Sequence, residues 1–306
     1  MSTHSTFTLN SGAKIPALGF GTWRSEPEKV KNAVKEALRI GYRHIDCASV
    51  YENQEEVGKA LRESDVPRDQ IWITSKLWNT EHNPKDVGPA CDDTLRKLGI
   101  DYLDLYLMHW PVAFKKDGDK FDTSVKHANG KPVLNDVSYV DTWKAMEKLV
   151  RDGKTRNIGV SNFNIAQLTT LLAAAEIPPA VNQVEVHPYN QNQKLIDFCK
   201  SKGIEVTAYC PIGSTGKPSV MEDPAVKEVA EETGHTPAQV ILAWGLQHGT
   251  SVIPKSVTPS RIESNFKSDF KLTDAQYQKI TNIGTKVRVC EPHDMWGLPE
   301  GTLFDE

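Results

Sequence analysis

Short apolar segments alternate with longer amphipathic stretches along most of the chain. The longer stretches place apolar residues three and four positions apart, as at Val30, Val34, Ala37 and Leu38, which predicts helices. The short segments predict eight strands: Leu18–Gly21, Ile45, Ile71–Thr74, Leu103–Met108, Ile158–Val160, Val181–Val186, Val206–Tyr209 and Val252–Ile253. Successive strand–helix units require a parallel sheet, and eight units in about 250 residues favour closure into an α/β barrel of the (β/α)8 or TIM type.

Three segments lie outside this repeat. Phe7–Leu9 and Lys14–Pro16 flank a turn, which predicts an N-terminal β-hairpin that we interpret as a plug or lid. Residues 111–137 and 285–306 are polar, with interspersed Pro and Gly, and we expect them to form long loops on the C-terminal face of the barrel. Within these two segments, the residues that either line a substrate pocket or dock on the scaffold are Phe114, Trp296, Leu298 and Phe304.

The length of 306 residues suits one barrel, so we expect residues 1–306 to form a single domain. The 36 basic and 40 acidic residues are spread along the chain, and the net charge is -4. Because no basic stripe is present, nucleic acid and anionic membrane surfaces are not expected partners. The expected partners are small molecules.

The cysteines indicate a reducing compartment. There are five of them, widely spaced and without a C-x-x-C pair, which disfavours a disulfide framework and a zinc site. The first six residues lack a basic-then-apolar signal, and no stretch approaches the roughly 20 apolar residues of a membrane span. These features predict a cytoplasmic protein.

Four residues of complementary chemistry follow the predicted strands: Asp46, Tyr51, Lys76 and His109. Taken singly, each has a structural explanation, as a surface side chain, a helix cap or a core histidine. The C-terminal ends of parallel barrel strands meet at one mouth, however, where such barrels place their chemistry. A phenol titrating near 10 needs a neighbouring cation to transfer its proton readily, and Lys76 can supply that cation with Asp46 as counter-charge. The four residues therefore supply the parts for carbonyl reduction, with His109 bonding the carbonyl oxygen.

Longer motifs make the interpretation more specific. Gly41–Ala48 with Tyr51, Gly159–Phe163 and Ile253–Ser256 resemble the aldo-keto reductase superfamily, nearest the aldose and aldehyde reductases. Fungal-type glycerol dehydrogenases and glyceraldehyde reductases are also similar. The resemblance implies that Asp46, Tyr51, Lys76 and His109 are the catalytic tetrad, with Tyr51 as general acid in reduction and general base in oxidation.

The same resemblance assigns the nicotinamide end of a cofactor. It implies that Ser161, Asn162 and Gln183 bond the carboxamide, and that Tyr209 stacks on the ring. Without it, Ser161–Asn162 would be interpreted as a helix N-cap and Gln183 as a barrel-interior residue. The residues implied beside the cofactor or along the substrate pocket are Gly21, Thr22, Trp23, Asp46, Trp78, His109 and Trp110.

A basic segment near the C-terminus bears on the choice of cofactor. Lys255 and Arg261, with the hydroxyls of Ser256 and Thr258 at the start of a predicted helix, form an anion site suited to a 2′-phosphate, which favours NADP(H) over NAD(H). The alternative is a capped helix with solvated basic residues. The resemblance adds cofactor contacts at Pro211, Ile212, Ser214, Val257 and Asn265. Two departures from the family pattern, Cys210 for Ser and Ser264 for Glu, affect a phosphate-side contact and the adenine contact.

Other oxidoreductase classes fit less well. Gly19–Gly21 lacks the third glycine of a dinucleotide fingerprint, and no Tyr-x-x-x-Lys pair or metal-ligand cluster is present. We therefore predict a monomeric NADP(H)-dependent oxidoreductase that reduces aldehydes or small sugars, with no metal. One alternative is a polyol or glycerol dehydrogenase acting in the oxidative direction. Another is a cofactor-binding regulatory subunit without turnover, as in the potassium-channel β-subunits that resemble this family.

Overall fold

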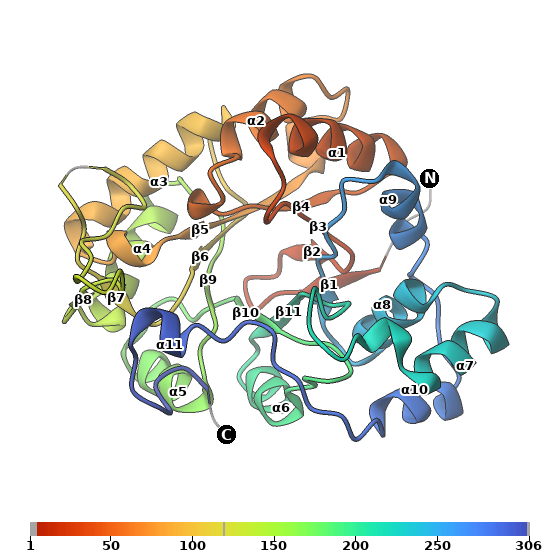
Figure 1. The fold of residues 1–306 in the computed structure, drawn as a ribbon. Helices are drawn as coiled ribbons and strands as arrows, with labels where there is room; N and C mark the ends of the chain where they lie inside the picture. Colours follow the sequence, from red (N-terminus) through yellow and green to blue (C-terminus); the bar gives the residue numbers. More distant parts are fainter. Residues whose placement is uncertain (1–4, 119, 305–306) are drawn as a thin grey trace.

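The computed structural model describes residues 5–118 and 120–304 (Figure 1). The described residues exclude residues 1–4 and residues 305–306 of the tail. The prediction that the first six residues carry no secretion signal depends in part on residues 1–4. None of the described helices combines the length and apolarity needed to cross a membrane.

Eight parallel strands form the central sheet, as predicted. In chain order they are β3 (Phe20–Gly21), β4 (His44–Asp46), β5 (Trp72–Leu77), β6 (Leu105–Met108), β9 (Ile158–Ser161), β10 (Val181–Glu185), β11 (Glu205–Tyr209) and β12 (Ser251–Val252). The last strand returns to the first: Val252 N–H donates to Ala17 O, and Gly19 N–H donates to Val252 O, both at 2.8 Å. These bonds close the sheet, which confirms the (β/α)8 barrel.

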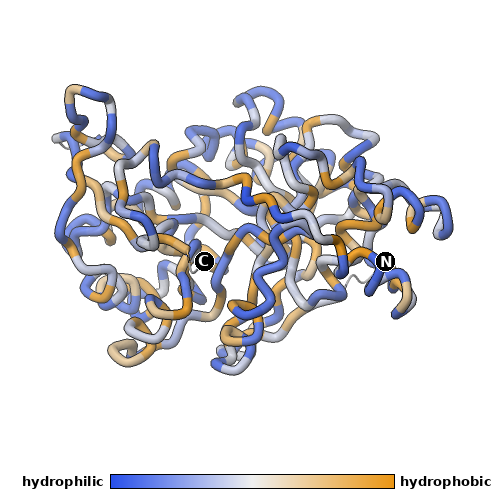
Figure 2. The backbone as a smooth tube through the Cα atoms, turned by 60° about the horizontal axis from the view of Figure 1, so that its bottom comes forward, coloured by the Kyte–Doolittle hydropathy of each residue, from blue (hydrophilic) through white to orange (hydrophobic). Residues whose placement is uncertain are grey.

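Helices surround the barrel (Figure 1). They are α1 (Pro27–Ile40), α2 (Gln54–Arg62), α3 (Pro84–Leu98), α4 (Tyr139–Arg151), α5 (Ile165–Ala174), α6 (Gln193–Ser201), α7 (Pro224–Thr233), α8 (Pro237–Gln247), α9 (Pro259–Phe266) and α10 (Asp274–Thr281). Their apolar stripes face the strands, and Val30, Val34 and Ala37 of α1 are completely buried. The loops that project from the molecule are largely hydrophilic (Figure 2).

The predicted N-terminal hairpin is present as β1 (Thr6–Thr8) and β2 (Lys14–Pro16). Ile15 of β2 is completely buried in a cluster with Trp72, Leu105 and Val181, which begin β5, β6 and β10. The hairpin therefore plugs the N-terminal end of the barrel, opposite the mouth. Of the two predicted roles, plug and lid, the structure supports the plug.

The two long segments carry more structure than the sequence predicted. Residues 111–137 contain a short antiparallel pair, β7 (Ala113–Phe114) and β8 (Leu134–Asn135). The tail runs from α10 past α6 and ends with α11 (His293–Trp296), beside α5 and the β7–β8 pair (Figure 1). Both segments thus lie over the side of the barrel where strands β5 to β10 end.

Candidate active site

The four residues of the predicted tetrad meet at the C-terminal mouth of the barrel. Asp46 ends β4, Lys76 lies near the end of β5, His109 directly follows β6, and Tyr51 ends the 3-10 helix η1 (Ser49–Tyr51). The completely buried Lys76 Nζ donates to Asp46 Oδ1 at 2.6 Å, to Cys47 O at 2.8 Å and to Tyr51 Oη at 3.3 Å. The sequence argument from strand ends is confirmed in its geometry.

The electrostatics of Tyr51 differ from expectation. Dense packing around its hydroxyl, together with the Asp46 charge and nearby cysteines, raises the pKa of Tyr51 well above its ordinary value of 10. The sequence predicted the opposite direction, because it weighed the Lys76 cation without the cost of burial. The Asp46 carboxylate lies 2.6 Å from the ammonium and offsets its charge. The phenol therefore keeps its proton at neutral pH.

His109 is a neutral imidazole in this environment. Burial lowers the pKa of His109 well below 6.5, and the charges of Lys76 and His82 act in the same direction. Its ring meets Tyr51 edge-on at 6.0 Å between centroids and Trp78 at 5.1 Å. A neutral ring at this position can donate a hydrogen bond to an oxygen in the mouth without changing its charge state.

The residues implied at the nicotinamide end form a connected network. Tyr209 Oη donates to Asn162 Oδ1 at 2.7 Å, and Asn162 Nδ2 donates to His109 O at 3.0 Å. Gln183 Nε2 donates to Asp46 Oδ2 at 2.7 Å, which joins β10 to β4 across the barrel. Ser161 Oγ donates to Gln183 O at 2.7 Å. The helix cap that was the alternative explanation of Ser161–Asn162 is wrong, because Asn164 caps α5.

The predicted anion site lies at the ends of β12 and β3. Lys255 Nζ donates to Arg24 O at 3.2 Å, and burial lowers the pKa of Lys255, with the Arg24 charge adding to the effect. Arg261 is exposed in the first turn of α9. Thr258 begins that helix without a side-chain cap, and its own N–H donates to Ser256 Oγ at 3.1 Å. The helix therefore lacks the cap of the alternative interpretation, whereas the exposure of Arg261 agrees with that interpretation.

The other predicted cofactor residues lie on β3, in the loops after β3 and β11, and around α9. A Cβ added to Gly21 would lie 2.9 Å from Ile253 O, so the two strands approach closely there. Thr22 Oγ1 donates to Asp46 O at 2.8 Å. The remaining members are Trp23, exposed beside Arg24; Pro211, Ile212 and Ser214 in the loop after β11; and Val257 and Asn265 around α9.

Aromatic residues from the two long segments pack beside His109. Trp78 contacts Phe114 and Trp296 at ring centroid distances of 6.1 and 6.0 Å, and Trp110 contacts Trp296 at 4.9 Å. Leu298 and Phe304 join the same cluster. Of the two alternatives from the sequence, docking on the scaffold is observed, since these side chains pack on one another. Trp78 connects the cluster to His109, and lining of a substrate pocket stays a prediction.

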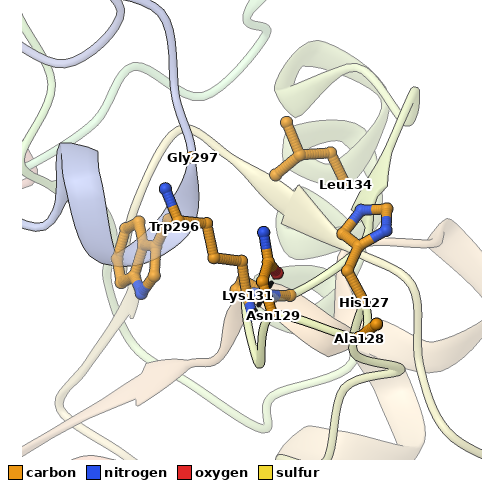
Figure 3. Close-up of a pocket in the computed structure, with 8 residues that line it drawn as sticks. His127, Ala128, Asn129, Lys131, Leu134, Trp296 and Gly297 are labelled. Carbon is orange, nitrogen blue, oxygen red and sulfur yellow. Dashed lines mark hydrogen bonds between the residues drawn. The ribbon is translucent and has the colours of Figure 1, made fainter.

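A surface pocket of about 630 Å³ opens between residues 127–134 and the end of α11 (Figure 3). Its lining residues are His127, Ala128, Asn129, Lys131, Pro132, Leu134, Trp296 and Gly297. None of the predicted catalytic or cofactor residues lines it. Trp296 alone belongs to both this pocket and the aromatic cluster.

Sequence reasoning missed two residues of the site. Arg24 lies over the Trp23 ring at 4.3 Å, next to the Lys255 contact. Glu185 ends β10 as a buried carboxylate two positions after Gln183, and therefore on the same side of the strand. Glu185 lies inside the predicted strand Val181–Val186, whereas the sequence argument selected polar residues that follow a predicted strand. No cluster of metal-ligating side chains occurs among residues 5–118 and 120–304.

Comparisons with known proteins agree with this geometry. A family model described as the aldo/keto reductase family matches residues 17–285. Aldo-keto reductase family 1 member A1 of Rattus norvegicus is 45% identical over 303 residues, covering 95% of this chain and 92% of the relative. The A1-A protein of Danio rerio is 47% identical over 300 residues, covering 94% and 92%. The aldose reductase structure from Schistosoma japonicum superposes with a TM-score of 0.91 at 42% identity, covering 98% of this chain and 100% of that one.

Proposed function

Because the chain belongs to the aldo/keto reductase family, whose members use NAD(P)H, we propose that it reduces aldehydes and small aldose sugars to alcohols with NADPH. Carbonyl reduction of small molecules is the chemistry of the family. The observation that carries the proposed reduction is the contact between the buried Lys76 ammonium and the Tyr51 hydroxyl at 3.3 Å.

The residues at the mouth fit a reduced nicotinamide nucleotide. Lys255 and Arg261 provide two cations near the start of α9, which suits the charge of a 2′-phosphate. When bound, the nucleotide supplies the hydride. Ser161, Asn162 and Gln183 would orient its carboxamide, and the Tyr209 ring would cover one face of the nicotinamide.

Tyr51 is the proposed proton donor. Its raised pKa keeps the phenol protonated, and the alkoxide that forms when the carbonyl carbon is reduced is a stronger base than a phenolate. The proton therefore moves downhill from Tyr51 Oη to the substrate oxygen. Lys76 Nζ donates a hydrogen bond to the same phenol oxygen and stabilises the phenolate that results. Asp46 holds the ammonium in place.

His109 is proposed to hold the carbonyl oxygen beside Tyr51. A neutral N–H next to the phenol stabilises the negative charge that develops on this oxygen without competing for the proton. The aromatic cluster of Trp78, Trp110 and Trp296 would form the wall of the substrate pocket, together with Trp23. The raised pKa of Tyr51 keeps the phenol protonated, which is the form that reduction uses, whereas oxidation uses the phenolate as base.

Turnover tests the proposal. Purified protein is mixed with glyceraldehyde, xylose, a uronic acid or glycerol, with each nucleotide in turn, and nicotinamide absorbance is followed. Tyr51→Phe should lower kcat by about 10²-fold or more while NADPH still binds. Unchanged turnover in this variant removes Tyr51 from the mechanism, and no turnover with any aldehyde favours the regulatory-subunit alternative. The monomeric state, the single domain and the cytoplasmic location stay predictions from the sequence.

A further inference from the structure

The tail is attached to the barrel mouth through one buried carboxylate. Glu185 Oε1 accepts the N–H of Val289 at 2.7 Å, and Oε2 accepts the N–H of Cys290 at 2.6 Å. His187 Nε2 lies 2.9 Å from Oε1. The Glu185 side chain is completely buried, so these bonds compensate a charge removed from water. We call Glu185, His187 and the N–H groups of Val289 and Cys290 the tail clamp.

The clamped residues lie directly against the site. Tyr209 is the register partner of Glu185 on the neighbouring strand β11. The Cys290 thiol lies near the Tyr209 phenol, and each affects the pKa of the other. Val289 packs against the loop after β11, since a Cβ at Gly216 would lie 2.7 Å from its Cγ2. Cys290 also packs against the aromatic cluster that includes Trp296. The clamp therefore sets where the tail passes between Tyr209 and the aromatic wall.

We propose that Glu185 is a positioning residue for substrate selection, which fixes the tail so that its aromatic side chains form one wall of the pocket. The inference rests on the proposed function, because it concerns the carbonyl substrate of the same mouth. Its action is through the tail, and Glu185 itself does not contact the reacting atoms. Large aldehydes, which reach the tail, depend on the clamp more than small ones.

The chain provides a matched control. Glu147 of α4 is also a buried carboxylate that accepts two successive backbone N–H groups, those of Glu176 and Ile177, at 2.7 and 2.9 Å. These partners lie at the end of α5, away from the tetrad. Glu147→Ala therefore reproduces the loss of a buried double acceptor without touching the tail.

The experiment compares Glu185→Ala, Glu185→Gln and Glu147→Ala. In Glu185→Ala, hydrogen exchange at the Val289 and Cys290 amides should accelerate by about 10-fold to 100-fold, as expected for loss of a charge-assisted bond. KM for benzaldehyde should rise about 10-fold, against less than about 3-fold for glyceraldehyde, with NADPH affinity unchanged. Glu185→Gln keeps an acceptor oxygen and should restore part of both effects. Unaltered tail exchange, or an equal change of the KM ratio in Glu147→Ala, overturns the proposal.

A truncated chain ending at Arg288 gives a second test if Glu185→Ala folds poorly. Truncation alone should raise KM for benzaldehyde, and adding Glu185→Gln to it should change this KM no further, since the two tail N–H groups that Glu185 accepts are gone and only His187 remains in contact with it. A further rise in KM shows that Glu185 acts through β10 and the cofactor end, which refutes the clamp. The exchange measurement needs no turnover, so failure of the clamp and failure of the proposed reductase activity are distinguishable.

Discussion

Replacing Lys76 by Met separates the contribution of this ammonium to folding stability from its contribution to proton transfer by Tyr51. The completely buried Lys76 lies 2.6 Å from Asp46 Oδ1 and 3.3 Å from Tyr51 Oη. Met has a similar shape without the charge, so Lys76→Met leaves the Asp46 carboxylate buried, with the Gln183 amide as its remaining side-chain donor among the described residues. Breaking a buried ion pair in this way costs about 3–5 kcal/mol of unfolding free energy.

The double variant Lys76→Met/Asp46→Asn removes the stranded charge as well. We expect most of the lost stability to return, with a coupling of at least about 2 kcal/mol in the double-mutant cycle. Activity should stay low, because no cation faces the phenol. At an effective dielectric constant of about 20, unit charges at the 3.3 Å distance between Lys76 Nζ and Tyr51 Oη interact by about 5 kcal/mol, which sets an upper bound of about 10³-fold to 10⁴-fold on the rate loss.

Urea unfolding at pH 7 and single-turnover reduction of glyceraldehyde measure the two quantities separately. Asp46→Asn alone completes the cycle and serves as the control for the loss of the carboxylate. If the double variant regains activity together with stability, the ammonium is not required for proton transfer. If Lys76→Met is as stable as the parent chain, the argument from the buried charge is wrong.

Three further predictions concern the phenol, the anion site and the packing of the helices. The pKa of Tyr51 is raised well above 10, and the pKa of His109 lies well below 6.5. The rate of reduction should therefore stay flat from about pH 6 to 9, whereas the rate of alcohol oxidation should rise over the same range. An inflection near pH 6.5 in the rates of both reactions contradicts a neutral His109. Arg261→Ala should raise KM for NADPH by about 10-fold or more and KM for NADH much less, and equal effects refute the 2′-phosphate assignment. Gly58→Ala should lower the unfolding free energy by about 1–3 kcal/mol, because the added Cβ would lie 2.5 Å from Leu98 O at the α2–α3 contact. Thermal unfolding measures this loss, and Gly88→Ala is the control, because nothing lies within 4 Å of a Cβ at Gly88.

Periodicity predicted the barrel well because the pattern it reads is created by burial. Each predicted strand is flanked by helices whose apolar stripes face it, and all eight occur where the apolar runs lie. Boundaries were less accurate where polar residues continue a strand. β5 extends to Leu77, past the predicted end at Thr74, because Ser75 and Lys76 are completely buried by partners that only the closed barrel provides.

The long segments were harder to predict because their partners are distant in sequence. Asp122 accepts the Ser49 hydroxyl at 2.7 Å beside η1, and Gln167 of α5 donates to Thr302 O at 2.8 Å in the tail. No local pattern encodes such contacts. The short strands β7 and β8 have only two residues each, too few for a periodicity to appear.

The sign of the Tyr51 pKa shift shows where chemical reasoning from sequence stops. Residue types identified the ammonium and the phenol correctly, and the structure brings them to 3.3 Å. The sign, however, depends on three quantities that only coordinates supply: the packing around Oη, the 2.6 Å contact that commits Lys76 to Asp46, and the cysteines nearby. Their sum stabilises the protonated phenol before the reaction, while the ammonium still stabilises the phenolate after proton transfer. A phenol with this balance holds its proton until a base stronger than a phenolate forms beside Oη.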